Sequence, residues 1–453
     1  MKRRSVIAIL LAAFLAVALS ITWVFWIDPS IEPNQASPSA SPPPETAFAE
    51  GATLLPQSSE PGSPPTTGAV QELWEEFSEE LPEGWQPWAV VANAQTGQVI
   101  FESGIDTPHT PASVTKVLTG FFALTYLDPL ETLSTGVSKD DSTLYLWGEG
   151  DLTLAAGKGD SRAPYGRAGV SDIADQVVAE LAGETGPFAL VYQAEFMGEK
   201  RAEAWFQQDV EDYAGDVAAF AIDTGRIYPG AWEFVPDSAQ GVAEVLEEAL
   251  VERGVKITEV LPGGKPPEGA TVIAQVESAP LIDQIRFMLE TSDNTMAEQL
   301  CQMADLAAGT ANPTFQSSTT TLVETLQQAG VSVTGIRLGD CSGLDEHNRI
   351  PPRVLLETLQ ASFDQPGTAV LTRLLPVAAV SGTLTGRLED GESQANYSAK
   401  TGSLGRTSTI AGIGTTASGG TIYVLVGVDD VPDGGAWWAR EPIDSFLEAL
   451  FAL

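Results

Sequence analysis

Histidine and cysteine are scarce in this chain of 453 residues, which contains only two of each. The two histidines, His109 and His347, lie far apart in the sequence, and neither stands in a metal-binding motif. Metal sites and histidine-based triads both need such residues gathered with acidic or cysteine partners. The sequence therefore argues against a metal centre and against a serine–histidine mechanism, and we expect no cofactor.

Basic residues are also few, with 23 Lys and Arg against 61 Asp and Glu and a formal net charge of −38. A nucleic-acid-binding surface has to be basic, so nucleic acid is excluded as a partner. The cysteine pair, Cys301 and Cys341, permits one disulfide in an oxidising compartment. Two separate buried thiols are the alternative, and the sequence leaves both open.

Basic residues at 2–4 precede an uncharged, mostly apolar stretch over 5–27 at the N-terminus. That length can cross a bilayer as a helix, and the basic residues favour a cytoplasmic N-terminus. We expect residues 1–27 to be a membrane anchor that holds the catalytic domain outside the cytoplasm. A cleaved signal peptide is the alternative, and it would make the protein secreted.

Residues 28–68 contain ten prolines and no apolar periodicity, which is typical of a disordered linker. Beyond it, two segments, 69–155 and 275–453, are predicted to form one catalytic domain, and 156–274 an inserted domain with no motif for chemistry. Apolar periodicity predicts helices at 70–77, 114–127, 173–181, 239–250, 281–289, 296–306 and 443–453, and strands at 88–94, 98–103, 143–147, 188–192, 408–413 and 421–428.

Ser113 and Lys116 stand three residues apart at the start of a long apolar helix, so their side chains should share one face. A serine hydroxyl needs a base to become a nucleophile, and a lysine can serve only if its amine is kept neutral by burial or by a neighbouring cation. Alone, such a pair is a weak signal, because a helix cap followed by a solvated lysine gives the same pattern.

Two later motifs strengthen the interpretation of Ser113 and Lys116 as a catalytic pair. Ser292-Asp293-Asn294 lies between two apolar helices, and Lys400-Thr401-Gly402 followed by Ser403 enters a run of strands. Ser-x-x-Lys, Ser-Asp-Asn and Lys-Thr-Gly in this order are the signature of penicillin-binding proteins and class A β-lactamases. Each of the last two motifs occurs once in the chain.

Each residue then has a task in acyl transfer. Ser113 would attack a carbonyl and Lys116 would take its proton, while Ser292 would relay the proton to the leaving amine. Asn294 would hold the Lys116 amine and the substrate amide. The charge of Lys400 would depress the pKa of Lys116, and Lys400, Thr401 and Ser403 would bind a substrate carboxylate. Gly402 would leave room for substrate along the strand edge, and the backbone N–H groups of Ser113 and Ser403 would form the oxyanion hole.

The chain resembles the serine-type D-Ala-D-Ala carboxypeptidases and endopeptidases, the class C low-molecular-mass penicillin-binding proteins. The spacing of 179 residues between Ser113 and Ser292 leaves room for the insert that this family carries. Residues 146–154, 340–344 and 382–387 also resemble its motifs, although Leu152 replaces a proline and Cys341 a glycine.

The resemblance implies a penicillin-binding or β-lactamase-like transpeptidase fold, an α/β (α+β) architecture in which helices flank an antiparallel sheet. It also implies peptidoglycan stem peptides as substrate and β-lactams as covalent inhibitors. A β-lactamase or esterase with the same site, and a non-catalytic wall-binding sensor, are the alternatives.

Overall fold

The computed structural model describes residues 62–389 and 391–453. The expected membrane anchor and most of the expected linker lie outside this range. Within it, no helix has both the length and the apolar character that a bilayer-spanning segment needs.

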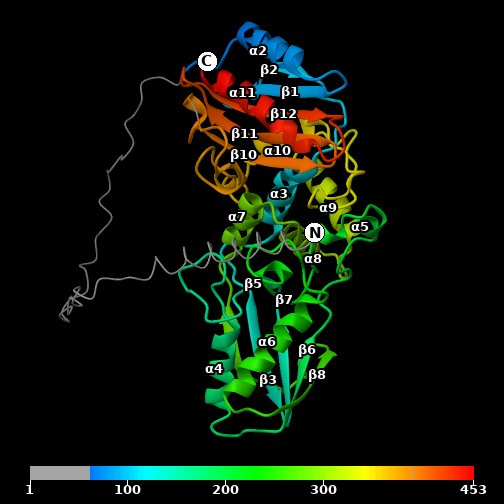
Figure 1. Ribbon diagram of the computed structural model, residues 1–453, viewed down its shortest axis with the longest axis vertical. Helices are drawn as coiled ribbons and strands as arrows, with labels where there is room; N and C mark the ends of the chain where they lie inside the picture. The colour runs from blue at the N-terminus through cyan, green and yellow to red at the C-terminus, as the bar shows by residue number, and fades with distance from the viewer. Residues whose placement is uncertain (1–61, 390) are drawn as a thin grey trace, which may run out of the picture. The chain divides into compact units, whose positions relative to one another are not determined.

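The catalytic domain is built on a five-stranded antiparallel sheet in the order β10-β11-β12-β1-β2 (Figure 1). Residues from the beginning and the end of the chain thus share one sheet, because β1 pairs with β12 along its whole length. The strands are β1 (Gln86–Asn93), β2 (Val99–Ser103), β10 (Tyr397–Leu404), β11 (Thr407–Thr415) and β12 (Thr421–Asp429).

Helices cover both faces of this sheet, and each face has its own apolar core. On one face, α2 (Thr67–Glu80) and α11 (Arg440–Phe451) pack against the strands through side chains such as Phe77 and Phe446. The other face packs on the helices that carry the first two motifs, and Phe122 and Met296 lie in that core. The motif-bearing helices are α3 (Lys116–Tyr126), α7 (Leu281–Thr291) and α8 (Asn294–Ala307), and α9 (Phe315–Gln328) and α10 (Pro352–Ala361) pack in the same core.

A second five-stranded sheet, in the order β8-β6-β4-β3-β9, forms the inserted domain. Its β4–β6 and β6–β8 pairs are parallel and its β3 pairs antiparallel, and α4 (Val170–Glu180) and α6 (Ser238–Glu252) share its apolar core. The strands are β3 (Ser134–Asp140), β4 (Thr143–Gly148), β6 (Phe188–Gln193), β8 (Ile257–Gly263) and β9 (Thr271–Glu277); β5 (Asp151–Leu154) and β7 (Phe220–Ile222) form a separate parallel pair.

The inserted domain therefore starts earlier than the predicted boundary at residue 156. Strands β3 and β4, which were expected in the catalytic domain, pair within the second sheet, and β9 extends past the predicted end at 274. Strand β3 pairs with β9, which is more than a hundred positions away, and local apolar patterns do not encode which sheet a strand joins.

Candidate active site

Ser113 lies in a 3₁₀ turn, η1 (Ala112–Thr115), that leads directly into α3. The predicted helix over 114–127 thus begins later, at Lys116, yet the pair still meets because a 3₁₀ turn places residues three apart on one side. The preceding Ala112 is buried and has φ of +49°, in the left-handed region that costs an L-residue about 1–2 kcal/mol. This strained turn fixes the direction of the Ser113 side chain.

The Lys116 amine is fully buried and sits at the centre of the site. Its Nζ lies 3.1 Å from the Ser113 hydroxyl, 2.6 Å from Oδ1 of Asn294 and 2.7 Å from the carbonyl oxygen of Ser342. The first and second motifs therefore converge on one nitrogen, as predicted. The third partner, in the loop after Asp340, was not anticipated.

Burial lowers the pKa of Lys116 from 10.5 to about 8, although the carboxylates of Asp340, Glu298 and Asp293 oppose the shift. Burial was one of the two expected causes, and the other, the charge of Lys400, is not among the causes of this shift. Burial also holds the pKa of Lys400 well below its ordinary value, and the charge of Lys116 lowers it further. Both amines thus lose a proton more easily than an exposed lysine does, mainly because neither reaches water.

Glu298 holds the loop that carries Ser342. It lies on α8 one turn after Asn294, is fully buried, and accepts hydrogen bonds from the backbone N–H of Cys341 and, at 2.7 Å, of Ser342. Burial and the nearby Asp340 carboxylate raise the pKa of Glu298 to about 8. A buried carboxyl and a buried amine therefore titrate in the same range on either side of the Ser342 peptide.

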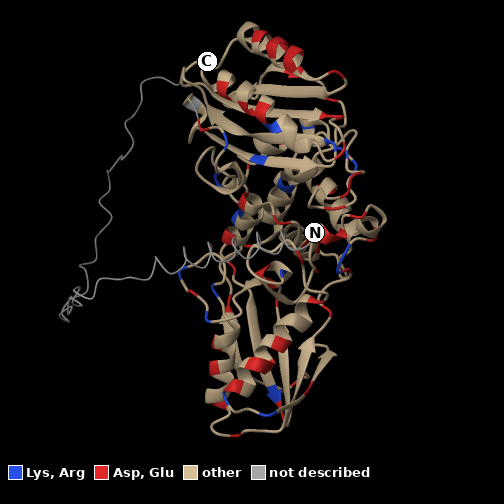
Figure 2. Ribbon diagram, in the orientation of Figure 1, with Lys and Arg blue, Asp and Glu red and all other residues tan. Residues whose placement is uncertain are grey.

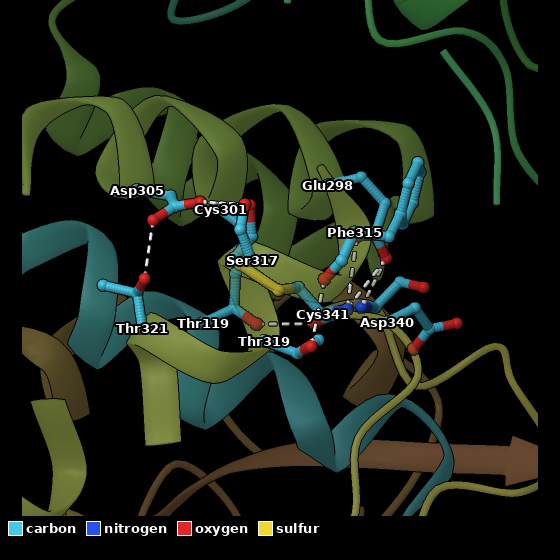
Figure 3. The surroundings of a disulfide bond; sticks show 12 residues. Thr119, Glu298, Cys301, Asp305, Phe315, Ser317, Thr319, Thr321, Asp340 and Cys341 are labelled. Carbon is cyan, nitrogen blue, oxygen red and sulfur yellow. Dashed lines mark hydrogen bonds between the residues drawn. A yellow bond between two sulfur atoms is a disulfide. The ribbon is translucent and has the colours of Figure 1, made fainter. Parts of the chain in front are cut away.

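A disulfide ties the same loop to the same helix. Cys301 on α8 and Cys341 are bonded, which resolves the alternative that the sequence left open. Figure 3 shows the bond beside Glu298, with the carbonyl oxygen of Cys341 accepting a hydrogen bond from Thr119 of α3. The loop is thus fixed to both motif-bearing helices.

The second motif forms the junction of α7 and α8. Ser292 ends α7 in the left-handed region, with φ of 61°, and the Asp293 side chain caps α8 by accepting from the N–H of Met296. Asn294 is therefore the first residue of α8, and the cap aims its amide at Lys116. Within the described residues, the Ser292 hydroxyl makes no hydrogen bond to Lys116 or Lys400, so its relay role stays a prediction.

The inserted domain forms one wall of the site, a part that sequence reasoning missed. Nδ2 of Asn294 donates to the carbonyl oxygen of Tyr213 at 2.9 Å. The buried Asp293 carboxylate accepts from Thr224 at 3.0 Å and pairs with Arg226 at 3.1 Å. The orientation of the second motif thus depends on residues of the insert, which carry no recognisable motif of their own.

The third motif lies on β10, the edge strand of the catalytic sheet. Lys400 is fully buried, and its Nζ donates to the backbone oxygen of Thr401 at 2.8 Å. The Thr401 hydroxyl donates to Thr383, in the Gly-Thr-Leu turn, at 2.7 Å. That turn was predicted as a motif element, and here it positions a hydroxyl of the third motif.

Gly402 has a packing role that the sequence did not suggest. A Cβ at this position would lie 2.8 Å from the carbonyl oxygen of Pro111, 3.1 Å from Cβ of Ala112 and 2.3 Å from the hydroxyl of Thr409. The missing side chain allows the strained turn before Ser113 to approach β10 closely. Gly402 therefore helps to position the turn that carries Ser113, and Pro111, Ala112 and Thr409 occupy the space that a side chain would take.

Ser403 and Ser113 line one cleft of about 570 Å³. Asn294 lies in the same cleft, and the inserted domain contributes residues 208–210 and Tyr213. The Ser403 hydroxyl also accepts a hydrogen bond of 3.2 Å from Arg440, a residue outside the three motifs. Glu298, Tyr213 and Arg440 were missed, and Ser342 was named only as part of the motif at 340–344, without a role. Of the missed residues, Glu298 had a signal, as an acidic residue four positions after Asn294 on a helix predicted to be apolar.

A serine–lysine pair at the junction of such a sheet and its helices defines an acyl-serine hydrolase of the penicillin-binding type. The chain belongs to the D-Ala-D-Ala carboxypeptidase 3 (S13) family, which its residues 71–233 and 230–449 match. It is accordingly a hydrolase of the D-Ala-D-Ala carboxypeptidase class, and the predicted family is confirmed.

Relatives of known name agree with this assignment. The carboxypeptidase DacB of Mycolicibacterium smegmatis is 35% identical over 376 residues, which cover 80% of this chain and 79% of that protein. A carboxypeptidase of Mycobacterium tuberculosis is 32% identical over 366 residues, covering 76% of each chain. The crystal structure of penicillin binding protein 4 from Haemophilus influenzae shares the fold, with a TM-score of 0.68, 21% identity, and coverage of 83% of this chain and 98% of that one.

Proposed function

We propose that the protein hydrolyses the terminal D-Ala-D-Ala bond of peptidoglycan stem peptides through an acyl-enzyme on Ser113, with Lys116 as the base. The observation that carries this proposal is the set of contacts of the Lys116 amine. A neutral amine has two N–H donors and one lone pair. The carbonyl oxygens of Asn294 and Ser342 can take the two donors, which leaves the lone pair for the Ser113 hydroxyl.

The proton of the Ser113 hydroxyl is transferred in two steps. As the Ser113 oxygen bonds to the substrate carbonyl carbon, its proton passes to Lys116. When the amide C–N bond breaks, the proton passes to the leaving D-alanine amine, with Ser292 as the proposed relay. Water afterwards cleaves the ester, which releases the shortened peptide as an acid and restores the Ser113 hydroxyl.

Substrate binding is assigned to β10. We assign the terminal carboxylate to Thr401, Ser403 and the charge available on Lys400, and the oxyanion to the backbone N–H groups of Ser113 and Ser403. Asn294 would hold the substrate amide through its Nδ2 group, since its Oδ1 accepts a hydrogen bond from Lys116. The same chemistry extends to endopeptidase cleavage of cross-links, in which the amine of a second stem peptide leaves in place of D-alanine.

Labelling with a fluorescent penicillin tests the nucleophile, because a β-lactam would acylate the same hydroxyl. We expect stable labelling of the wild-type protein and none of Ser113→Ala. Release of D-alanine from a D-Ala-D-Ala pentapeptide tests the reaction. Labelling of the folded Ser113→Ala variant would contradict the assignment, and rapid turnover of the penicillin would favour the β-lactamase alternative.

We further propose that the catalytic domain works outside the cytoplasm, tethered through residues 1–27. The basic residues that precede the apolar run, and the disulfide, support this location. Fractionation of cells should recover the protein with membranes, and protease added outside the cytoplasmic membrane should degrade it. Recovery in the cytoplasmic fraction would contradict the proposal.

A further inference from the structure

A groove of about 660 Å³ lies near the catalytic cleft, and two adjacent tryptophans line it. Trp437 and Trp438 belong to the short turn η7 (Ala436–Ala439), directly before α11, and they are 67% and 60% exposed. Residues 386–389 form another part of the lining. Large apolar side chains gathered in a hollow with polar neighbours are typical of a binding surface, because leaving them in water has no structural benefit.

Arg440 connects this groove to the catalytic cleft. Its guanidinium stacks on the Trp437 ring, with 4.1 Å between Cζ and the ring centroid, and its Nη2 donates to the Ser403 hydroxyl. Ser403 belongs to the strand that we propose to bind substrate. One guanidinium group therefore separates that strand from the Trp437 ring, and a ligand that extends beyond the cleft would reach the groove.

The rest of the groove is polar and rich in carboxylates. Glu389 and Glu441 line it, together with Asp444, whose carboxylate binds Arg387 in two hydrogen bonds of 2.6 and 2.9 Å. Carboxylates accept hydrogen bonds from hydroxyl and amide groups but repel anions. The groove thus suits a neutral ligand that carries many donors and at least one apolar face.

We propose that this groove binds sugar rings of the peptidoglycan strand, with Trp437 and Trp438 stacking on them. A pyranose ring has an apolar C–H face that matches the electron-rich face of an indole, and its hydroxyl and acetamido groups can donate to carboxylates. The inference rests on the proposed function, because the sugar is the part of that substrate attached to the peptide. It adds a second recognition element beyond the D-Ala-D-Ala end.

Exposed tryptophans also occur where a protein meets a membrane surface. The carboxylates of this groove and the net charge of −38 oppose approach to anionic lipid. The charges near α11 in Figure 2 are mostly acidic, which agrees with this argument. Sugar is therefore the occupant to which the chemistry points.

Binding can be measured without hydrolysis by titrating the full-length protein with a β-1,4-linked N-acetylglucosamine tetramer in a calorimeter. We expect binding by the wild-type protein and by Ser113→Ala, and at least a tenfold weaker affinity for Trp437→Ala/Trp438→Ala. Trp232→Ala is the matched control, since Trp232 is 82% exposed in the inserted domain. Equal affinity of the double variant, no binding by the wild type, or tryptophan-dependent binding to vesicles of anionic lipid instead would overturn the proposal.

Kinetics supply a second readout, the ratio of kcat/KM for a disaccharide-pentapeptide to that for the free pentapeptide. The Trp438→Ala variant should lower this ratio about tenfold through KM, and Trp232→Ala should not change it. An unchanged ratio in Trp438→Ala would count against the sugar site. If neither substrate released D-alanine, the proposed function would fail while tetramer binding could still be measured, so the two failures are distinguishable.

Discussion

The Lys116 amine donates a hydrogen bond of 2.7 Å to the carbonyl oxygen of Ser342, a residue 226 positions away in a loop. The N–H of the same residue donates to Glu298. The proposed base is therefore positioned by a peptide group that a buried carboxyl and a disulfide hold in place. The chemistry of the site depends on this loop as much as on the three motifs.

The rate of acylation should depend on the protonation of Lys116. Because the pKa of this amine is lowered to about 8, the neutral form dominates only above that pH. We expect the second-order rate of penicillin labelling to rise about tenfold per pH unit below pH 8 and to level off above it. Stopped-flow measurement of labelling against pH checks this, and a plateau reached only above pH 10 would show that Lys116 keeps its ordinary pKa.

Glu298→Gln should move this pH profile to lower pH. The carboxylate of Glu298 raises the pKa of Lys116, so its removal should lower that pKa. An amide oxygen can still accept from the N–H of Ser342, which preserves the loop. Glu324→Gln, an exposed change on α9, is the control and should leave the profile in place.

Glu298→Gln should also change how the stability of the folded protein depends on pH. The pKa of Glu298 in the folded protein is about 8, above its ordinary 4.5, so its ionisation opposes folding and stability falls as pH rises between these values. Glu298→Gln should remove that part of the pH dependence in thermal unfolding. An unchanged pH profile and an unchanged unfolding curve together would show that Glu298 does not titrate in this range.

Removal of the disulfide should lower the free energy of unfolding. The Cys301–Cys341 bond closes a loop with a sequence separation of 40, for which chain entropy predicts a loss of about 4 kcal/mol. Urea unfolding of the Cys301→Ala/Cys341→Ala variant measures this loss. The reduced wild-type protein should unfold at a similar urea concentration, and a variant as stable as the oxidised wild type would refute a stabilising role.

Gly402→Ala should slow acylation by about a hundredfold. The added methyl group would meet backbone atoms of Pro111 and the Thr409 side chain, so the turn before Ser113 would have to shift. A shift of about 1 Å at a reacting group can cost that much. The control is Gly264→Ala, since a Cβ there would meet nothing within 4 Å. Equal labelling rates for both variants would contradict the packing role of Gly402.

The parts of the fold and of the site that were predicted correctly are those with a clear pattern in the local sequence. Strands β1, β2, β11 and β12 and the motif-bearing helices have clear apolar periodicity, and the contacts of Lys116 with Ser113 and Asn294 follow from the motifs. By contrast, β3 (Ser134–Asp140) has one large apolar residue, Val137, and α9 is rich in threonine and depends on a capping box at Thr314 and Ser317. Tertiary packing overrides weak propensity in both elements.

Other features of the site could not be predicted from any local sequence pattern. The Tyr213 and Ser342 contacts to the site are made by backbone carbonyl oxygens, which every residue has, so no side chain could reveal them. The role of Gly402 depends on the distance between two chain segments almost 300 positions apart. Helix α10 was not among the predicted helices, although Pro352 at its start and the apolar spacing that follows are typical of a helix.

The inserted domain leaves and rejoins the catalytic domain at neighbouring points. At its neck, the N–H of Ser278 donates to the carbonyl oxygen of Leu133 at 2.9 Å, and Ser134 pairs with Glu277. Because its two ends are adjacent, the inserted domain could be enlarged, shortened or replaced during evolution with little change to the sheet behind Ser113. Any replacement would have to restore the contacts that the inserted domain makes with the catalytic domain, among them Tyr213 with Asn294, Thr224 with Asp293 and Trp205 with Asp340.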